Sequence, residues 1–423
     1  MSKRPLILDL VLYGTAALFA GATALWTTLT PHEHWGAVAF GGYASAAFVA
    51  AVLLMQFGAS WLKRALVAGA TGIAVVAIPL VAQAIERANG ATGRAQEEVL
   101  VVEGSGRRLL DTGSPYLHAD AIAGMADPVL GYNPYQPGMA VFGLPSALFG
   151  HHWWTDARVY FLLATLACLA AALRLLSEHA GKGTLLRALQ VSVVFPVCAL
   201  TFVTGGDDMP VVGLMVLALA FCASGRPLGA GLAIGTAGAL KLFAWPVAVV
   251  LAFLVWRRFG AQASPFGALR RYLLGFAVPV AATMVPVLLL DARGFFDNVI
   301  AFGLGHGVVE SPAQSPLPGF LVARYVPGGE LLAPVLLGSA ALVIAVLLWT
   351  RPPATAASAA LWSAAGLSAA FLLMPSTRFG YLLYPVVLLG WWLPLRDAAA
   401  TAAEQLSDGA ESPGPSLAVE WWR

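Results

Sequence analysis

The sequence predicts an all-α fold, a polytopic bundle of transmembrane helices. Only 11% of its 423 residues are charged and 59% are hydrophobic, whereas soluble domains carry about 25% charged residues. The mean hydropathy is +0.77. Apolar runs long enough to cross a bilayer, about 20 residues each, recur along the whole chain. These observations together indicate a multi-pass membrane protein.

The apolar runs predict about 12 membrane helices. Ten runs meet the length criterion singly: 7–29, 36–57, 63–84, 157–176, 186–204, 209–225, 270–290, 331–350, 356–374 and 379–395. The segment 227–256 is too long for one span and contains Trp245-Pro246, where a helix would break. We therefore expect two short helices there, forming a hairpin. We assign residues 1–396 to one membrane domain and expect 397–423 to be a disordered cytoplasmic tail.

Positive charges orient the predicted bundle, because Lys and Arg concentrate in cytoplasmic loops. The cations that this span count places on one side are Lys3, Arg4, Lys63, Arg64, Arg174, Lys182, Arg187, Arg226, Arg257, Arg258, Arg270, Arg271, Arg351 and Arg396. The opposite side receives a first loop, 85–156, a second loop, 291–330, and two short turns, 204–210 and 374–378. We expect those loops to be external and both termini to be cytoplasmic.

The stretch 97–150 is the longest polar interruption, and it gathers carboxylates, paired arginines, tyrosines and prolines. Long loops in compact proteins are usually functional or disordered, and this one is too apolar for a disordered linker. Its periodicity predicts two helices at the membrane interface, 98–110 and 135–149. Another segment, Gly229 to Gly235, places glycines at a spacing that favours close helix packing over phosphate binding.

Several motifs of the loops resemble those of a known enzyme family. The motifs are Glu98, a β-branched pair, Gly106-Arg107, Leu109-Leu110, Pro115-Tyr116, the Tyr-x-Pro-Tyr-x-Pro stretch 132–137, the segment Gly238 to Pro246, and Pro375-Ser-Thr-Arg378-Phe-Gly-Tyr381. Their order resembles the GT-C membrane glycosyltransferases, above all glycosyltransferase family 87, the polyprenol-phosphate-mannose-dependent mannosyltransferases. The chain departs from the family in having glutamate at Glu98 instead of aspartate, three spans before the loop instead of one, and Gly-Gly-Asp-Asp at 205–208.

The resemblance implies inverting transfer of a sugar from a lipid phosphate, which needs a carboxylate as general base. Glu98 takes the place of the family's acidic residue, with Glu97 and Glu103 as alternatives. A glutamate stabilised by the helix dipole at a helix start is the non-catalytic interpretation. We expect Lys241 and Arg378 to contact the phosphate, since cations stabilise the charge that develops on the departing lipid.

Other loop residues are candidates for binding substrate, each with a structural alternative. Arg107 and Arg108 contact phosphate or are arginines that snorkel to the interface. Asp207 and Asp208 bind hydroxyls or a divalent metal, or cap the helix that begins at Met209-Pro210. The remaining candidates are His306, which is flanked by glycines, and Tyr116 and Tyr135 in the first loop.

The predicted partners are a polyprenyl-phosphate-mannose donor, a glycan or glycolipid acceptor and membrane lipids, with no nucleic acid. The expected location is a bacterial plasma membrane. Cys168, Cys198 and Cys222 lie inside apolar runs without metal-ligand spacing, so we assign no metal ligand, although a divalent ion at Asp207-Asp208 stays open. A transporter or flippase of lipid-linked sugars is the alternative function, and it predicts polar groups across the bilayer and repeat symmetry.

Overall fold

The computed structural model describes residues 3–56, 60–259 and 265–411. Within these ranges the chain forms helices and no strand, apart from one isolated β-bridge between Gln314 and Thr377. The all-α prediction is confirmed.

A helix occupies every predicted membrane position. These helices are α1 (Arg4–Trp26), α2 (Thr30–Met55), α3 (Trp61–Gly72) continued by the π-turn η1 (Ile73–Ala77) and α4 (Ile78–Ala88), α8 (Ala157–Leu176), α9 (Lys182–Leu189) with η5 (Gln190–Val194) and α10 (Pro196–Thr204), α11 (Asp208–Ala223), α12 (Pro227–Leu240), α13 (Ala244–Phe259), α14 (Pro265–Phe295), α16 (Gly329–Thr350), α17 (Ala356–Leu373) and α18 (Leu383–Glu411).

Fewer helices than the predicted 12 are long and apolar enough to cross a membrane by themselves. Among the described residues seven qualify, or eight if the pair Lys182–Val194 and Pro196–Thr204, bent by 44°, forms one span. The bend lies where Pro196 removes a backbone donor. Two further helices, α11 and α12, are apolar but shorter. Most residues of α11 are buried, so protein side chains surround this helix and little of it would face lipid.

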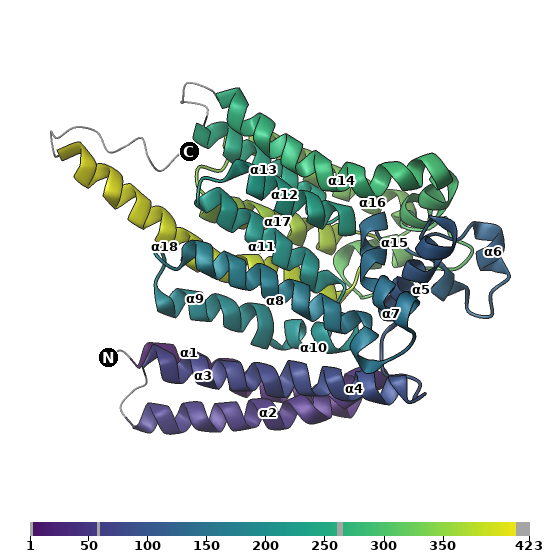
Figure 1. The fold of residues 1–423 in the computed structure, drawn as a ribbon, viewed down its shortest axis with the longest axis horizontal. Helices are drawn as coiled ribbons and strands as arrows, with labels where there is room; N and C mark the ends of the chain where they lie inside the picture. Colours follow the sequence, from purple (N-terminus) through teal and green to yellow (C-terminus); the bar gives the residue numbers. More distant parts are fainter. Residues whose placement is uncertain (1–2, 57–59, 260–264, 412–423) are drawn as a thin grey trace.

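The helices run roughly along one axis, and α1 begins at the same end of the bundle at which α18 ends (Figure 1). We call the other end, with residues 89–156, 205–207, 241–243, 302–328 and 374–382, the loop end. In Figure 1 helices α5, α6, α7 and α15 gather there, away from both termini. All segments predicted to be external therefore lie together.

Three N-terminal spans form a layer against the rest of the bundle (Figure 1). A buried ion cluster ties this layer to α9 at the end opposite the loop end. Asp9 on α1 accepts from Arg64 on α3 at 3.0 Å and pairs with Arg187 on α9 at 2.9 Å. Asp9 was not among the predicted residues, although an acidic residue in an apolar span rarely lacks a partner.

Close packing through glycine joins α12 to α14. A β-carbon on Gly231 would lie 2.1 Å from the carbonyl oxygen of Tyr272, and one on Gly235 would lie 2.4 Å from that of Phe276. Only glycine allows backbones to approach this closely, so the packing prediction for 229–235 is confirmed. The predicted hairpin is present as α12 and α13, but it turns at Lys241 to Phe243, before the Trp245-Pro246 pair.

The first loop is folded almost throughout. It contains α5 (Glu97–Thr112), α6 (Ala119–Ala123), α7 (Leu144–Phe149) and the 3₁₀ turns η2 (Pro128–Gly131), η3 (Pro137–Gly143) and η4 (Trp153–Thr155). The helix predicted at 98–110 is α5, and the one predicted at 135–149 is η3 followed by α7. Gly106 of α5 packs directly on the backbone of Gly143, which holds the two helices together.

The end of α14 and the turn that follows it hold the first loop in place. Asn298 accepts from the backbone of Asn133 at 2.8 Å and donates to the carbonyl of Leu117 at 2.7 Å. Asp291 accepts from Ser114 at 2.5 Å and lies 2.9 Å from Nε2 of His118. Because these contacts bury the polar backbone of the first loop, the loop has a defined position over the bundle.

Two predicted boundaries differ from the structure. Residues 291–301, predicted to open the second loop, continue α14 as far as Phe295 and then form the π-turn η6 (Phe296–Ala301). Residues 397–411, predicted to be a disordered tail, are the last turns of α18, because their alanine-rich sequence favours helix. The rest of that predicted tail, 412–423, lies outside the described residues.

Candidate active site

Glu98 lies in the first turn of α5, where the loop meets α10. The backbone N–H of Gln96 donates to the carbonyl of Thr204 at 2.8 Å, and the Thr204 hydroxyl donates to the Gln96 side chain at 3.0 Å. Val99 and Val102 are fully buried and fix which face of α5 points inward. The start of α5 is therefore attached to the end of α10, three residues before Asp207.

Arg378 donates to Oε1 of Glu98. The side chain of Arg378 is 26% exposed and that of Glu98 is 14% exposed, so the pair is largely shielded from solvent. Backbone bonds from Ser315 to Thr377 at 2.9 Å and from Thr377 to Ala313 at 2.8 Å fix the segment before Arg378. The other oxygen of Glu98, Oε2, is buried and has no hydrogen-bond partner among the described residues. Such an oxygen can accept a proton or a hydroxyl hydrogen bond.

Lys241 lies between two aspartates at the turn of the α12–α13 hairpin. Its Nζ is 2.7 Å from Oδ2 of Asp207 and also contacts Oδ1 of Asp208. The hydroxyl of Tyr384 donates to the same Asp208 oxygen at 2.6 Å. All three charged residues are buried. Burial opposes the charged form of Lys241, but the two carboxylates outweigh this effect and raise its pKa. For Asp207, burial raises the pKa despite the nearby ammonium.

The capping interpretation of the two aspartates is wrong. Asp207 occupies the N-cap position of α11, but neither its side chain nor that of Asp208 makes a capping hydrogen bond. Both carboxylates turn to Lys241 instead, because an ion pair in a buried setting is stronger than a bond to a neutral N–H. No direct sign of this pairing is visible in the sequence, since Lys241 follows more than 30 residues later.

Aromatic rings enclose the ammonium group. Nζ of Lys241 lies 5.2 Å from the ring centre of Tyr135, 5.4 Å from that of Phe243 and 5.5 Å from that of Tyr381. Rings at this distance attract a cation through their negative faces. Burial raises the pKa of Tyr135, which Asp207 raises further, so this phenol stays protonated. The enclosure includes Phe243, which the sequence analysis did not single out.

The two charge clusters adjoin at Tyr381. Burial raises the pKa of its phenol, while both Lys241 and Arg378 act to lower it. Together they hold three carboxylates, Glu98, Asp207 and Asp208, and two cations, Lys241 and Arg378, which gives a formal charge of −3 + 2 = −1. Each cation already has a carboxylate partner. An anionic substrate would therefore have to exchange places with one of those carboxylates.

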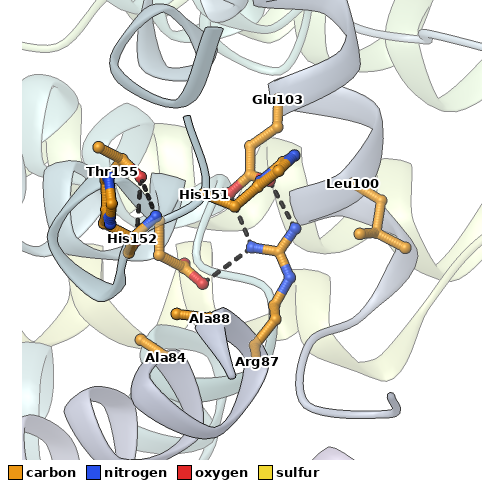
Figure 2. A pocket seen from close by; sticks show the side chains of 9 residues that line it. Ala84, Arg87, Ala88, Leu100, Glu103, His151, His152 and Thr155 are labelled. Atoms are coloured by element: carbon orange, nitrogen blue, oxygen red, sulfur yellow. Dashed lines mark hydrogen bonds and ion pairs between the residues drawn. The ribbon is translucent and has the colours of Figure 1, made fainter. Parts of the chain in front are cut away.

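The rival carboxylates for the catalytic role lie elsewhere on α5. Glu97 is exposed. Glu103 is buried and accepts from Arg87 of α4 at 2.8 Å. Figure 2 shows this pair beside a cavity, which is lined by Ala84, Arg87, Ala88, Leu100, Glu103, His151, His152, Thr155 and Asp156. None of the residues of the Glu98 and Lys241 clusters lines that cavity.

The remaining predicted residues lie away from the two clusters or serve the loop. Arg107 is 71% exposed at the far end of α5. Arg108 donates to the carbonyl of Pro115 and to Ser105, each at 3.0 Å. The buried hydroxyl of Tyr116 donates to the carbonyl of Tyr135 at 2.8 Å, and His306 is exposed in the second loop. Substrate contacts by these four residues stay predictions.

No group of three or more His, Cys, Asp or Glu side chains in the described ranges could hold a metal ion. From the sequence, a divalent ion bound by Asp207 and Asp208 had been left as a possibility. In the structure the ammonium of Lys241 occupies the position between their carboxylates.

The fold is a helical membrane bundle in which a charged cluster lies under a folded loop. The model of glycosyltransferase family 87 matches residues 133–376, more than half of the 423 residues. The chain therefore belongs to glycosyltransferase family 87, and its apolar helices make it a multi-pass membrane protein. Because the match begins after Glu98 and ends before Arg378, it does not extend to that pair.

Similar solved structures include ArnT from Cupriavidus metallidurans in two states. The apo structure has a TM-score of 0.43 and 18% identity and covers 74% of this chain and 58% of its own. The structure bound to undecaprenyl phosphate has a TM-score of 0.46 and 16% identity, with 75% and 59% covered. This chain thus spans about three fifths of the length of these proteins. No curated protein matches the sequence.

Proposed function

We propose that this glycosyltransferase transfers a sugar, which we take to be mannose, from a polyprenyl phosphate to a glycan or glycolipid acceptor. Membership of family 87 supports the lipid-linked donor. The observation that carries the proposal is the position of Glu98, which has one oxygen paired with Arg378 and the other buried and unpartnered. A carboxylate with a free oxygen, held in place by a neighbouring cation, suits a general base.

The proposed reaction is a single displacement at the anomeric carbon. The acceptor oxygen attacks that carbon as Oε2 of Glu98 removes the hydroxyl proton. The bond between the carbon and the phosphate oxygen breaks, and its electron pair leaves with the polyprenyl phosphate. Because attack and departure occur on opposite faces of the sugar, the configuration inverts.

Arg378 is the proposed phosphate contact. Its guanidinium pairs with one oxygen of Glu98 in the structure, and a guanidinium group also binds phosphate oxygens, with which it can form a two-pronged contact. We propose that the donor phosphate replaces Glu98 as the partner of Arg378. Binding of the donor would then release the carboxylate to act as base and stabilise the charge on the leaving lipid.

For Lys241 we propose a role other than the phosphate contact expected from the sequence. Its ammonium pairs with Asp207 and Asp208, so it compensates the charge of two buried carboxylates. Ionised carboxylates accept hydrogen bonds from hydroxyl groups, and we propose that the two aspartates bind sugar hydroxyls. The expected location, a bacterial plasma membrane with the loop end outside and both termini cytoplasmic, stays part of the proposal.

The test is transfer of labelled mannose from synthetic polyprenyl-phosphate-mannose by the protein purified in detergent, with an envelope glycolipid extract as acceptor. A flippase performs no chemistry and moves nothing in detergent, so it would yield no labelled product. Labelled product that retains the configuration at the anomeric carbon would contradict the displacement. Product of inverted configuration is the expected result.

A further inference from the structure

Arg158 is the most deeply buried cation of the loop end, and it makes four hydrogen bonds. It is the second residue of α8 and has no exposed surface. Its Nε and Nη2 donate to the two oxygens of Asp156, each at 2.8 Å. Its Nη1 donates to the carbonyl of Arg94 and to the carbonyl of Val203, both at 2.7 Å. Half of its bonds therefore go to the main chain of two other segments.

Those two carbonyls belong to the segments that carry the acidic residues of the site. Arg94 lies four residues before Glu98, and Val203 lies four residues before Asp207. Directly beyond Arg158, the two segments join through the bonds between Gln96 and Thr204. One guanidinium thus holds the junction from which Glu98 and the Lys241 cluster both extend.

The charges around Arg158 balance within the protein. Asp156 also accepts from Arg87 at 3.0 Å. Arg87 in turn donates to Glu103 at 2.8 Å, and Figure 2 shows this pair beside the cavity. Glu103 in turn accepts from the backbone N–H of Ala157 at 3.2 Å. Two cations face two carboxylates, so the network has no excess charge with which to bind an anionic substrate. Its effect is to fix α4, α5, α8 and α10 relative to one another.

We propose that Arg158 is a positioning residue for sugar transfer, one that sets the spacing between Glu98 and the Asp207–Asp208–Lys241 cluster. The proposal rests on the proposed function, in which these groups act on the same sugar. Because reacting groups must be held within a fraction of an ångström, a displacement of about 1 Å can lower the rate about 100-fold. A change at Arg158 would therefore affect the rate without touching substrate.

The first variant is Arg158→Lys, which keeps the network neutral. A lysine ammonium is a compact donor group and cannot reproduce the planar fork that spans a carboxylate and two carbonyls. We expect kcat to fall about 10–100-fold, as for a displaced base, with the KM for the lipid-linked sugar essentially unchanged. An unchanged kcat would overturn the proposal, and so would a rise in KM alone.

Arg64→Lys is the matched control. Arg64 is also a buried arginine that binds an aspartate, Asp9, but it lies at the end of the bundle opposite the site. We expect Arg64→Lys to lower the thermal stability of the protein and to leave kcat unchanged. If both variants lowered kcat equally, Arg158 would be holding the fold in general and the positioning role would be excluded.

A disulfide that restores the junction would separate a positioning role of Arg158 from a general contribution to stability. The backbone N–H of Gln96 donates to the carbonyl of Thr204 at 2.8 Å, and the two side chains are also hydrogen-bonded, so cysteines at these two positions can be tested for disulfide formation. We expect Gln96→Cys with Thr204→Cys to restore kcat to Arg158→Lys when oxidised and to lose that gain on reduction. Recovery of thermal stability without recovery of kcat would overturn the proposal.

A last measurement needs no activity, so it distinguishes failure of this inference from failure of the proposed function. The rate at which the same two cysteines form a disulfide is compared in the parent and in Arg158→Lys. We expect slower closure in Arg158→Lys, because the two segments are no longer held together. Equal rates would overturn the positioning role even if the parent transferred no sugar.

Discussion

At the scale of single residues, Lys241 supplies the positive charge that compensates the two buried carboxylates of the site. Its ammonium faces Asp207 and Asp208 in a buried setting enclosed by aromatic rings. Removal of one partner from a buried ion pair destabilises a protein by about 3–5 kcal/mol, because the remaining charge stays uncompensated. Here one cation serves two carboxylates, so its loss leaves both of them without a compensating positive charge.

We predict that Lys241→Met lowers the free energy of unfolding by about 3–5 kcal/mol, measured by denaturant titration in detergent. The double variant Lys241→Met with Asp208→Asn should recover part of that loss, since one uncompensated charge is removed. Lys182→Met is the control, because Lys182 is exposed and contacts only the ring of Trp61 among the interactions described. Equal stability of Lys241→Met and the parent would contradict the compensation argument.

The proposed exchange of partners at Arg378 makes a second residue-scale prediction. A hydrogen bond to a charged group contributes about 1.5–3 kcal/mol, which corresponds to about 10–150-fold in affinity. Arg378→Gln should weaken binding of polyprenyl phosphate by that factor. The measurement is calorimetric titration, with Arg293→Gln as control, because Arg293 is also a loop-end arginine but is 67% exposed. Unaltered affinity in Arg378→Gln would exclude the phosphate role.

Lys241 was a candidate because a charge within an apolar hairpin conflicts with its surroundings. Glu98 was a candidate because it takes the place of the acidic residue in the motif that resembles the family. Their partners could not be predicted, since the pairs Lys241–Asp208 and Arg378–Glu98 join residues 33 and 280 positions apart. Arg158 was missed for the same reason. An Asp-Ala-Arg sequence at the start of an apolar span was the available signal.

At the scale of elements, glycine sets how closely α12 and α14 approach. We predict that Gly231→Ala destabilises the protein by about 1–3 kcal/mol, the usual cost of overpacking, because its β-carbon would meet the carbonyl of Tyr272. Gly338→Ala in α16 is the control, since a β-carbon there has no neighbour within 4 Å. Thermal unfolding of both variants checks this, and equal melting temperatures would contradict it.

Apolar periodicity was sufficient to locate the membrane helices, because the length of a span is set by the bilayer. It was insufficient for their ends. The hairpin turns at Lys241 and not at Pro246, since Lys241 leaves the helix to reach the aspartates, and α18 continues to Glu411. Long-range contacts and local helix propensity decided these boundaries, and neither is visible in hydropathy.

At the scale of the whole molecule, the start of α1 and the end of α18 lie at one end, opposite the loops (Figure 1). We predict that the loop end is external. In a background without Cys168, Cys198 and Cys222, Glu97→Cys should react with an impermeant maleimide on intact cells. Lys182→Cys, at the opposite end, should react only after permeabilisation. The reverse pattern would place the site in the cytoplasm.

The central claim is that Glu98 is the base of a sugar transfer, and near-isosteric variants test it most directly. General-base catalysis contributes about 10²–10⁴-fold to a rate. Transfer of mannose from polyprenyl-phosphate-mannose should therefore fall by at least about 100-fold in Glu98→Gln, with the affinity for the donor retained. Exposed Glu97 should tolerate the same change. Full transfer by Glu98→Gln together with loss in Glu97→Gln would contradict the account.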